Sequence, residues 1–122
     1  MPRWKPKGWH SVTPRLVVED PARQVKFLKQ AFGATGSLER LRPSEILVGD
    51  SMVMVSGTGP REAIPAILYL YVEDVDTTYA KALKAGGAVI EEPVDVPYGD
   101  RRCIVLDPCG NTWQIATRIA SR

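Results

Sequence analysis

The order of apolar and polar positions occurs twice along the chain. Residues 16–34 read LVVEDPARQVKFLKQAFGA, and residues 70–88 read LYVEDVDTTYAKALKAGGA. In each stretch a short apolar run leads through Val-Glu-Asp into apolar positions three or four residues apart, and the pattern ends at glycine. A duplicated unit that cannot bury its apolar face alone must pack against its copy. We therefore expect two similar modules with a cleft at the seam between them.

The first module is expected to contain a strand, a helix and a hairpin. Residues 11–18 are rich in β-branched side chains, which predicts a strand. A helix is predicted from Pro21, because Asp20 can accept the first unpaired helical N–H groups and proline fits the first helical position. Gly33 supplies a left-handed stop. Two apolar runs around a Gly-Asp-Ser turn predict the hairpin strands, at residues 45–48 and 52–56.

The second module repeats this order. A strand is predicted over residues 66–72, and Asp74 is expected to cap a helix that ends at Gly86 and Gly87. The sequence DPCGN at residues 107–111 predicts a tight turn in the last hairpin. The remaining strands of the module are predicted over residues 88–90, 102–106 and 112–117.

Length and composition favour one compact domain. At 122 residues with 44% hydrophobic content, the chain can form one core and is short for two separate domains. We expect a single domain over residues 1–122, with modules at 10–57 and 66–119, a linker at 57–65 and an arm at 1–9. The arm alternates basic residues with tryptophan, which favours an edge-packing or flexible segment. A nucleic-acid or ligand contact is the alternative for this arm.

Charge and cysteine content argue against several classes of protein. The formal charge of +2 comes from 16 basic and 14 acidic residues that are interspersed, so no nucleic-acid partner is expected. No apolar run approaches the roughly 20 residues that cross a bilayer, so we expect no membrane partner and a soluble, cytoplasmic protein. Cys103 and Cys109 lack a CxxC spacing, which argues against a zinc site or a disulfide framework.

Several of these features together resemble one known superfamily. They are the paired βαβββ modules, the Val-Glu-Asp helix start in each copy, the loop YGDR at residues 98–101 and the ending DPCGNTWQIAT at residues 107–117. This combination resembles the vicinal oxygen chelate superfamily, which includes glyoxalase I, bleomycin-resistance proteins and extradiol dioxygenases. The start GWHSVTP at residues 8–14, with the same ending, resembles its PhnB-like branch.

The resemblance covers residues 10–117 and carries expectations about fold and site. It implies an α+β fold in which two tandem βαβββ modules form a half-open, eight-stranded scoop with the helices outside, the glyoxalase/bleomycin-resistance fold. It also implies a ligand in the concavity, commonly within a homodimer.

Enzymes of this superfamily hold a divalent metal through strand positions occupied by His, Glu or Gln, two from each module. By resemblance these positions fall on Thr13, Met54, Ile67 and Gln114. Only Gln114 is an ordinary ligand, because a thioether and an alkyl group cannot supply the nitrogen or oxygen donors that such an ion needs. We therefore expect that the metal site is lost and that no cofactor is bound, with a divalent metal as the alternative.

His10 is the only histidine and needs separate consideration. It lies three residues before Thr13, so a regular strand would turn it to the opposite face. A structural or surface role is favoured, while a ligand-contacting or acid–base group and a metal ligand are the alternatives. A catalytic role would require a carboxylate within hydrogen-bond reach, and Glu45 is one candidate by type.

Strand alternation predicts which side chains line the scoop. The inward set contains several Met and Tyr side chains, which form an adaptable apolar surface that suits a medium-sized organic molecule. The alternative is that the methionines only fill the scoop. Tyr98, in the loop before a strand, can stack on a flat ligand. The predicted ligand-binding residues are Thr13, Arg15, Met52, Met54, Ile67, Tyr69, Tyr71, Tyr98 and Gln114.

Three charged residues near this lining carry more specific expectations. An inward Arg15 would need a carboxylate or an anionic ligand group, and the alternative is a position at the rim. Asp100 and Arg101 are expected to pair with each other and to shape the turn after Tyr98.

The sequence thus favours a metal-free protein that binds a small organic ligand in the concave sheet or at a dimer interface, without catalysis. A second hypothesis is a metal-dependent lyase, isomerase or dioxygenase of the same superfamily whose metal is held by re-sited ligands such as His10, Glu45 and Gln114. A third is a dimeric accessory protein without a ligand site. The identity of the ligand does not follow from the sequence, since fold alone does not define function.

Overall fold

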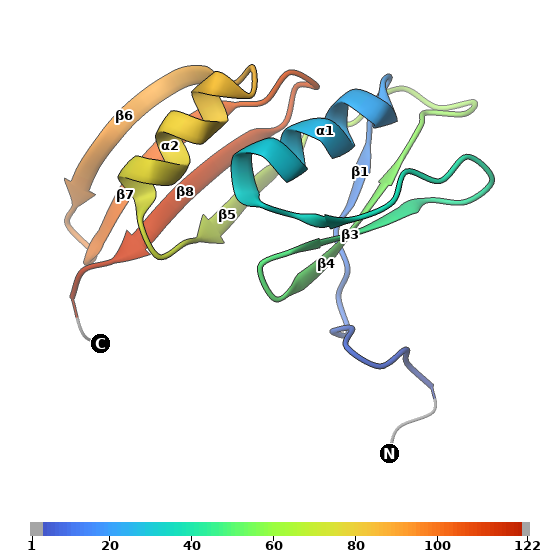
Figure 1. Cartoon of the computed structure of the whole chain (residues 1–122), viewed down its shortest axis with the longest axis horizontal. Coiled ribbons are helices and arrows are strands. Elements are labelled where there is room, and N and C mark those ends of the chain that lie inside the picture. Colours follow the sequence, from blue (N-terminus) through green and yellow to red (C-terminus); the bar gives the residue numbers. More distant parts are fainter. Residues whose placement is uncertain (1–3, 121–122) are drawn as a thin grey trace.

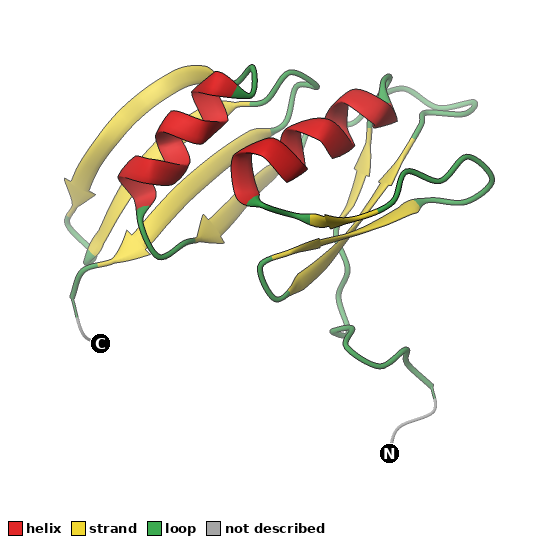
Figure 2. Ribbon diagram, in the orientation of Figure 1, coloured by secondary structure: helices red, strands yellow, loops and turns green. Residues whose placement is uncertain are grey.

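The computed structural model describes residues 4–120, which form two four-stranded sheets, each with one helix on one face (Figure 1, Figure 2). Sheet A consists of β1 (Arg15–Val17), β2 (Thr35–Gly36), β3 (Ser44–Val48) and β4 (Ser51–Ser56), with α1 (Pro21–Phe32). Sheet B consists of β5 (Ile67–Tyr71), β6 (Ala88–Val96), β7 (Asp100–Leu106) and β8 (Thr112–Arg118), with α2 (Val75–Lys84).

The two sheets have the same topology. Their strand orders are β1-β4-β3-β2 and β5-β8-β7-β6. In each sheet the first strand of the module pairs in parallel with the last, and the other pairs are antiparallel. The predicted α+β fold of two tandem βαβββ modules is therefore confirmed, with its eight strands divided between two open sheets. No helix within residues 4–120 is long and apolar enough to span a membrane.

Both helices begin at the predicted aspartates. Asp20 accepts a hydrogen bond from the Arg23 N–H at 3.1 Å, and Asp74 accepts one from the Thr77 N–H at 3.2 Å. Each carboxylate thereby satisfies one of the helical N–H groups that lack an internal partner. After α1, Gly33 adopts a φ of 67°, the left-handed conformation that ends the helix.

Four strands differ from the sequence predictions by more than one residue at an end or were not expected. β7 begins at Asp100, two residues before the predicted start. β1 begins only at Arg15, because Pro14 has no N–H to donate, although its carbonyl accepts from the Met54 N–H at 2.9 Å. β2 was not predicted, since two residues carry no periodic pattern. β6 continues to Val96 instead of ending at residue 90. Its Glu, Asp and Pro residues disfavour an interior strand, but β6 is a sheet edge, where proline is tolerated.

The apolar core lies between the helices and their sheets. α1 and α2 pack side by side (Figure 1). Phe32 of α1 contacts Trp113 of β8 with ring centroids 4.8 Å apart, so side chains of the two modules share one core. The side chains of the strands that face the helices are buried at Leu16, Val18, Val53, Val55, Val105, Trp113 and Ile115, whereas Leu68 and Leu70 are half-buried.

A buried carboxylate organises the turn between β7 and β8. Asp107 is 3% exposed, and no cation pairs with it in the described part of the chain. Its Oδ1 accepts from the N–H groups of Cys109 and Asn111 at 2.8 and 3.0 Å. Its Oδ2 accepts from Gln24 Nε2 at 2.8 Å and Trp113 Nε1 at 2.9 Å. Four donors therefore replace the water that this carboxylate loses on burial.

The same network connects the two modules. Asn111 Nδ2 donates to Gln24 Oε1 at 2.9 Å, and Asn111 Oδ1 accepts from the Ala66 N–H at 2.7 Å. Gln24 lies on α1 and is fully buried, whereas Asn111 lies between β7 and β8. A polar contact thus fixes α1 of the first module against the last turn of the second.

Both cysteines are free thiols. Cys103 is fully buried in β7, and Cys109 lies in the turn before β8. Burial raises the pKa of each thiol to about 11. Both therefore stay protonated at neutral pH, which makes them poor metal ligands and poor nucleophiles.

Candidate functional site

Sheet B exposes an aromatic and polar surface on the side away from α2. We call this surface the open face; it comprises Ile67, Tyr69, Tyr71, Tyr98, Asp100, Arg102, Ile104 and Gln114. Strand register places Tyr69 beside Gln114, and Gln114 beside Ile104. The exposed fractions of Ile67, Tyr69 and Tyr71 are 75%, 38% and 53%. The tyrosines predicted from alternation therefore lie together and can be reached from solvent.

Asp100 is the buried centre of the open face. It is fully buried, and its Oδ2 accepts from the hydroxyl groups of Tyr69 and Tyr71 at 2.6 and 2.8 Å. Its Oδ1 accepts from Arg118 Nη1 at 2.9 Å. The hydrogen bond from Tyr69 contributes most to holding the pKa of Asp100 below its ordinary value, although burial acts in the opposite direction. Burial and the bond to Asp100 raise the pKa of Tyr69.

The predicted pairing of Asp100 with Arg101 is wrong. Neighbouring strand residues point to opposite faces, so Arg101 lies on the side of α2. There its Nε and Nη2 donate to the Asp76 carboxylate at 2.9 and 3.1 Å, and its Nη1 donates to Asp95 at 3.0 Å. Arg101 therefore ties α2 to β6 and β7, while Asp100 serves the open face.

Tyr98 and Arg102 extend the cluster around Asp100. The Tyr98 and Tyr69 hydroxyl oxygens are 3.1 Å apart, and Arg102 Nη1 donates to the Tyr98 hydroxyl at 3.0 Å. Arg102 Nη2 donates to Glu91 Oε1 at 2.9 Å. Three of the predicted ligand-binding residues, all tyrosines, are thus held in one hydrogen-bonded group.

The depressed pKa of Asp100 predicts a pH dependence of stability. Because folding lowers this pKa from about 3.9, the native state holds the proton less tightly than the unfolded state. The stabilisation is complete above about pH 4 and is lost as the pH falls through the native pKa. We expect the difference in free energy of unfolding between the wild type and Asp100→Asn to narrow over that range. Urea unfolding at a series of pH values measures it, and a constant difference would contradict this assignment.

A cavity of about 790 Å³ lies at the seam between the modules. Phe32 and Val48 line it from the first module, and Tyr71, Thr117 and Arg118 line it from the second. The cleft expected at the seam is therefore present. Because Tyr71 and Arg118 also contact Asp100, this cavity adjoins the open face.

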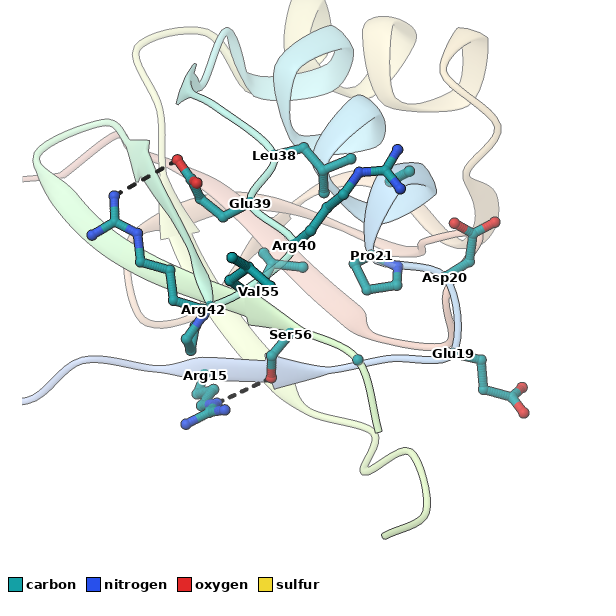
Figure 3. A pocket seen from close by; sticks show the side chains of 14 residues that line it. Arg15, Glu19, Asp20, Pro21, Leu38, Glu39, Arg40, Arg42, Val55 and Ser56 are labelled. Carbon is teal, nitrogen blue, oxygen red and sulfur yellow. Dashed lines mark hydrogen bonds and ion pairs between the residues drawn. The ribbon is translucent and has the colours of Figure 1, made fainter. Parts of the chain in front are cut away.

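The remaining predicted site residues lie in or beside sheet A. Arg15 donates from Nε to Ser56 Oγ at 3.0 Å and is exposed, so it lies at the rim (Figure 3). It borders a second cavity, of about 620 Å³, between the start of α1 and residues 38–43. Of the predicted ligand-binding residues, Arg15 alone lines this cavity. Met54 of β4 is the register partner of Arg15 on β1 and of Glu45 on β3, and Met52 of β4 is the register partner of Leu47 on β3.

The residues at the superfamily's metal positions do not fit a metal ion. The positions lie two in each module, as in the superfamily: Thr13 before β1 and Met54 in β4, and Ile67 in β5 and Gln114 in β8. Within sheet B, Gln114 lies beside Tyr69 and not beside Ile67. The set offers one thioether and one alkyl group in place of oxygen or nitrogen donors. Within residues 4–120, no group of three or more His, Cys, Asp or Glu side chains could hold a metal ion.

The alternative ligand set comes from three separate parts of the chain. His10 is exposed in the segment before β1, Glu45 lies on β3, and Gln114 lies on β8 of the other sheet. Glu45 has a salt-bridge partner in Arg42 at 3.7 Å.

Of the predicted arm, residues 1–3 lie outside the described residues. Trp4 is 74% exposed, and Lys5 donates to the Trp9 carbonyl.

Sequence reasoning missed Asp100, Arg102 and Arg118 as members of the site. The alternation of β8 contains a signal for one of them: residue 118 lies four positions after Gln114, which is predicted to point inward, and so falls on the same face. Asp100 and Arg118 are also direct register partners. The sequence instead predicts that Asp100 and Arg101 shape a turn, whereas both are the first residues of β7.

Two βαβββ modules, each an open sheet with one helix, define the class of fold to which this protein belongs. The chain is a member of the Glyoxalase/Bleomycin resistance protein/Dioxygenase superfamily, whose family model matches residues 10–115. The superfamily expected from the sequence is confirmed.

Curated relatives and solved structures are also similar to this chain. The chain is 28% identical over 123 aligned residues to an uncharacterized protein of Mycobacterium bovis, covering 86% of this chain and 81% of that protein. It is 30% identical over 106 residues to "Putative glyoxylase CFP32" of the same organism, covering 82% of this chain but 41% of that protein.

Among solved structures, TioX from Micromonospora sp. ML1 matches with a TM-score of 0.78 at 24% identity, covering 90% of this chain and 99% of TioX. A glyoxalase/bleomycin resistance protein/dioxygenase family enzyme from Burkholderia phytofirmans PsJN matches with a TM-score of 0.77 at 19% identity, covering 88% and 97% of the two chains. At these identities the likeness shows the fold alone.

Proposed function

We propose that this protein binds a small organic molecule without a metal ion and that the open face of sheet B carries the recognition. The observation that carries the proposal is the group of exposed tyrosines held around the buried Asp100 on the open face. Exposed apolar side chains gathered beside polar groups are typical of ligand-binding surfaces.

The arrangement of the tyrosines supports recognition of a flat molecule. The rings of Tyr69 and Tyr71 have centroids 5.4 Å apart and an interplanar angle of 57°. Their hydroxyl groups are fixed on Asp100, so little side-chain freedom is lost when a ligand binds. Ile67 adds an exposed apolar surface on the same strand. Gln114 offers an amide that can donate or accept.

The metal-independent part of the proposal rests on the residue types at the superfamily's metal positions. Thr13, Met54 and Ile67 are poor ligands, and Gln114 alone cannot hold a divalent ion. A homodimer, a cytoplasmic location, membership of the PhnB-like branch and a bleomycin-resistance type of role stay predictions.

Binding can be tested by NMR with protein that has been treated with EDTA. Indole, quinoline, tryptamine and indole-3-acetate serve as flat probes of similar size. We expect at least one of them to shift amide signals of β5, β7 and β8 while those of β2 and β3 stay in place. Tyr69→Ala is expected to weaken binding about tenfold, because it removes an aromatic contact worth on the order of 1 kcal/mol or more.

Trp4→Ala is the matched control, since it removes an exposed aromatic side chain away from the open face. An equal loss in this variant would place recognition on the arm. A requirement for added Zn²⁺, Ni²⁺, Mn²⁺ or Fe²⁺ would overturn the metal-independent proposal. No shift with any probe would favour the accessory protein without a ligand site.

A further inference from the structure

We infer that the open face selects molecules that donate hydrogen bonds over molecules that only accept them. The inference rests on the proposed function and adds the chemical class of the ligand: a flat aromatic or heteroaromatic compound with an N–H or O–H group. It follows from the direction in which the hydroxyl hydrogens of the tyrosine cluster must point.

The two ends of the cluster determine that direction. Arg102 carries a guanidinium, which can only donate, and Asp100 carries a carboxylate, which can only accept when ionised. Tyr69 lies 2.6 Å from Asp100, so its one hydroxyl hydrogen is committed to that carboxylate. Tyr98 accepts from Arg102 at 3.0 Å. At 3.1 Å from Tyr69, whose hydrogen is already used, Tyr98 must be the donor.

Every bond in the series Arg102, Tyr98, Tyr69, Asp100 therefore has its hydrogen directed toward Asp100. Tyr71 also gives its hydroxyl hydrogen to this carboxylate. A ligand that approaches the hydroxyl groups of Tyr69 and Tyr98, which belong to side chains 38% and 46% exposed, meets oxygen lone pairs. An N–H or O–H group is received there, whereas a carbonyl, ether or pyridine-type nitrogen is repelled.

The other polar groups of the open face do not reverse this preference. The Gln114 amide can accept from one class of ligand and donate to the other, so it does not distinguish them. Arg102 has a side chain only 18% exposed, its Nε is enclosed, and it already donates to Tyr98 and Glu91. Arg118 already donates to Asp100 and to the Tyr98 carbonyl. The charges of Asp100 and Glu91 balance those of the two arginines, so hydrogen-bond direction, rather than net charge, distinguishes the ligands.

Asp100→Asn reverses the direction without changing the size of the side chain. Arg118 can only donate, so the carbonyl oxygen of the new amide must face it, and the amide nitrogen takes the place of Oδ2. That nitrogen then donates to the hydroxyl oxygens of Tyr69 and Tyr71, from which Oδ2 accepted. The hydroxyl hydrogens are released and become available to a ligand that accepts.

Indole and quinoline test the inference, because they are flat bicycles of similar size, uncharged at neutral pH, of which one only donates and the other only accepts a hydrogen bond. NMR titration of the wild type is expected to show about tenfold tighter binding of indole. In Asp100→Asn the ratio is expected to fall to one or below. Tyr98→Phe, which removes one accepting oxygen and leaves Asp100 intact, is expected to reduce the preference and serves if Asp100→Asn does not fold.

Asp95→Asn is the matched control, since it removes the same charge from an exposed aspartate that pairs with Arg101 on the opposite face. Its ratio is expected to equal that of the wild type. Equal binding of both probes by the wild type, tighter binding of quinoline, or the same fall of the ratio in Asp95→Asn overturns the inference and leaves the proposed function standing. If none of the four probes (indole, quinoline, tryptamine and indole-3-acetate) binds, the proposed function itself is contradicted.

Discussion

Asp107→Ala is expected to lower the free energy of unfolding by about 4 kcal/mol, because it removes the acceptor of several buried hydrogen bonds at once. The substitution leaves buried donors of Gln24, Trp113 and Asn111 without their acceptor. Such donors cannot regain water without opening the packing between α1 and β8. Urea unfolding followed by circular dichroism measures the change, with the midpoint expected to fall while the slope stays constant.

Asp50→Ala is the corresponding control in the first module. Asp50 lies in the turn between β3 and β4, the counterpart of the turn that contains Asp107, but it is exposed and bonds only to Ser51 within the described residues. We expect a change within about 0.5 kcal/mol there. A loss below 1 kcal/mol for Asp107→Ala would show that the network adds little to stability.

Gly87→Ala is expected to destabilise the protein by about 3 kcal/mol, the upper part of the range for overpacking. The backbone of Gly87 is not left-handed, so the cost is steric: an added Cβ would lie 2.6 Å from Val105 Cγ1 and 2.8 Å from the Ala82 carbonyl oxygen. Both neighbours are fully buried, so neither can move aside without separating α2 from β7. Thermal unfolding by calorimetry measures the effect.

Gly57→Ala provides the comparison at the end of sheet A. The nearest atom to its added Cβ is Pro21 Cγ at 3.7 Å, an ordinary contact, and its backbone is also outside the left-handed region. This variant is expected to be neutral or slightly more stable, because alanine restricts the unfolded chain. Equal melting temperatures for the two variants would refute the steric account of Gly87.

Most of the fold could be predicted because its determinants are local. The aspartates before each helix, the glycine after α1 and the apolar spacing act within one or two turns of chain, and the repetition of the pattern shows where the second module begins. β6 could not be predicted in full, because it is held in place by pairing with β7, which is distant in the sequence. Glu91 pairs with Ile104 and Val94 with Arg102, and Glu92 and Pro93 lie at an irregularity between these pairs.

The candidate site was predictable only where alternation decides it. Ile67, Tyr69 and Tyr71 follow from a period of two along one strand, and the structure places all of them on the open face. The role of Asp100 depends on the distance between β5 and β7, two strands separated by β8, and no local pattern contains that distance. For Arg15 the sequence leaves two positions open, one inward beside an anionic group and one at the rim. Its hydrogen bond to Ser56 and its exposure correspond to the rim.

The contact among Gln24, Asn111 and Asp107 has a consequence for the two copies of the repeat. The side-chain amide of Gln24, in the helix of the first copy, bonds to Asp107 and Asn111 in the final turn of the second, so separating the halves breaks these hydrogen bonds. We therefore expect the two halves to unfold together in one cooperative transition. A break in the linker between them is expected to leave two fragments that fold only when both are present.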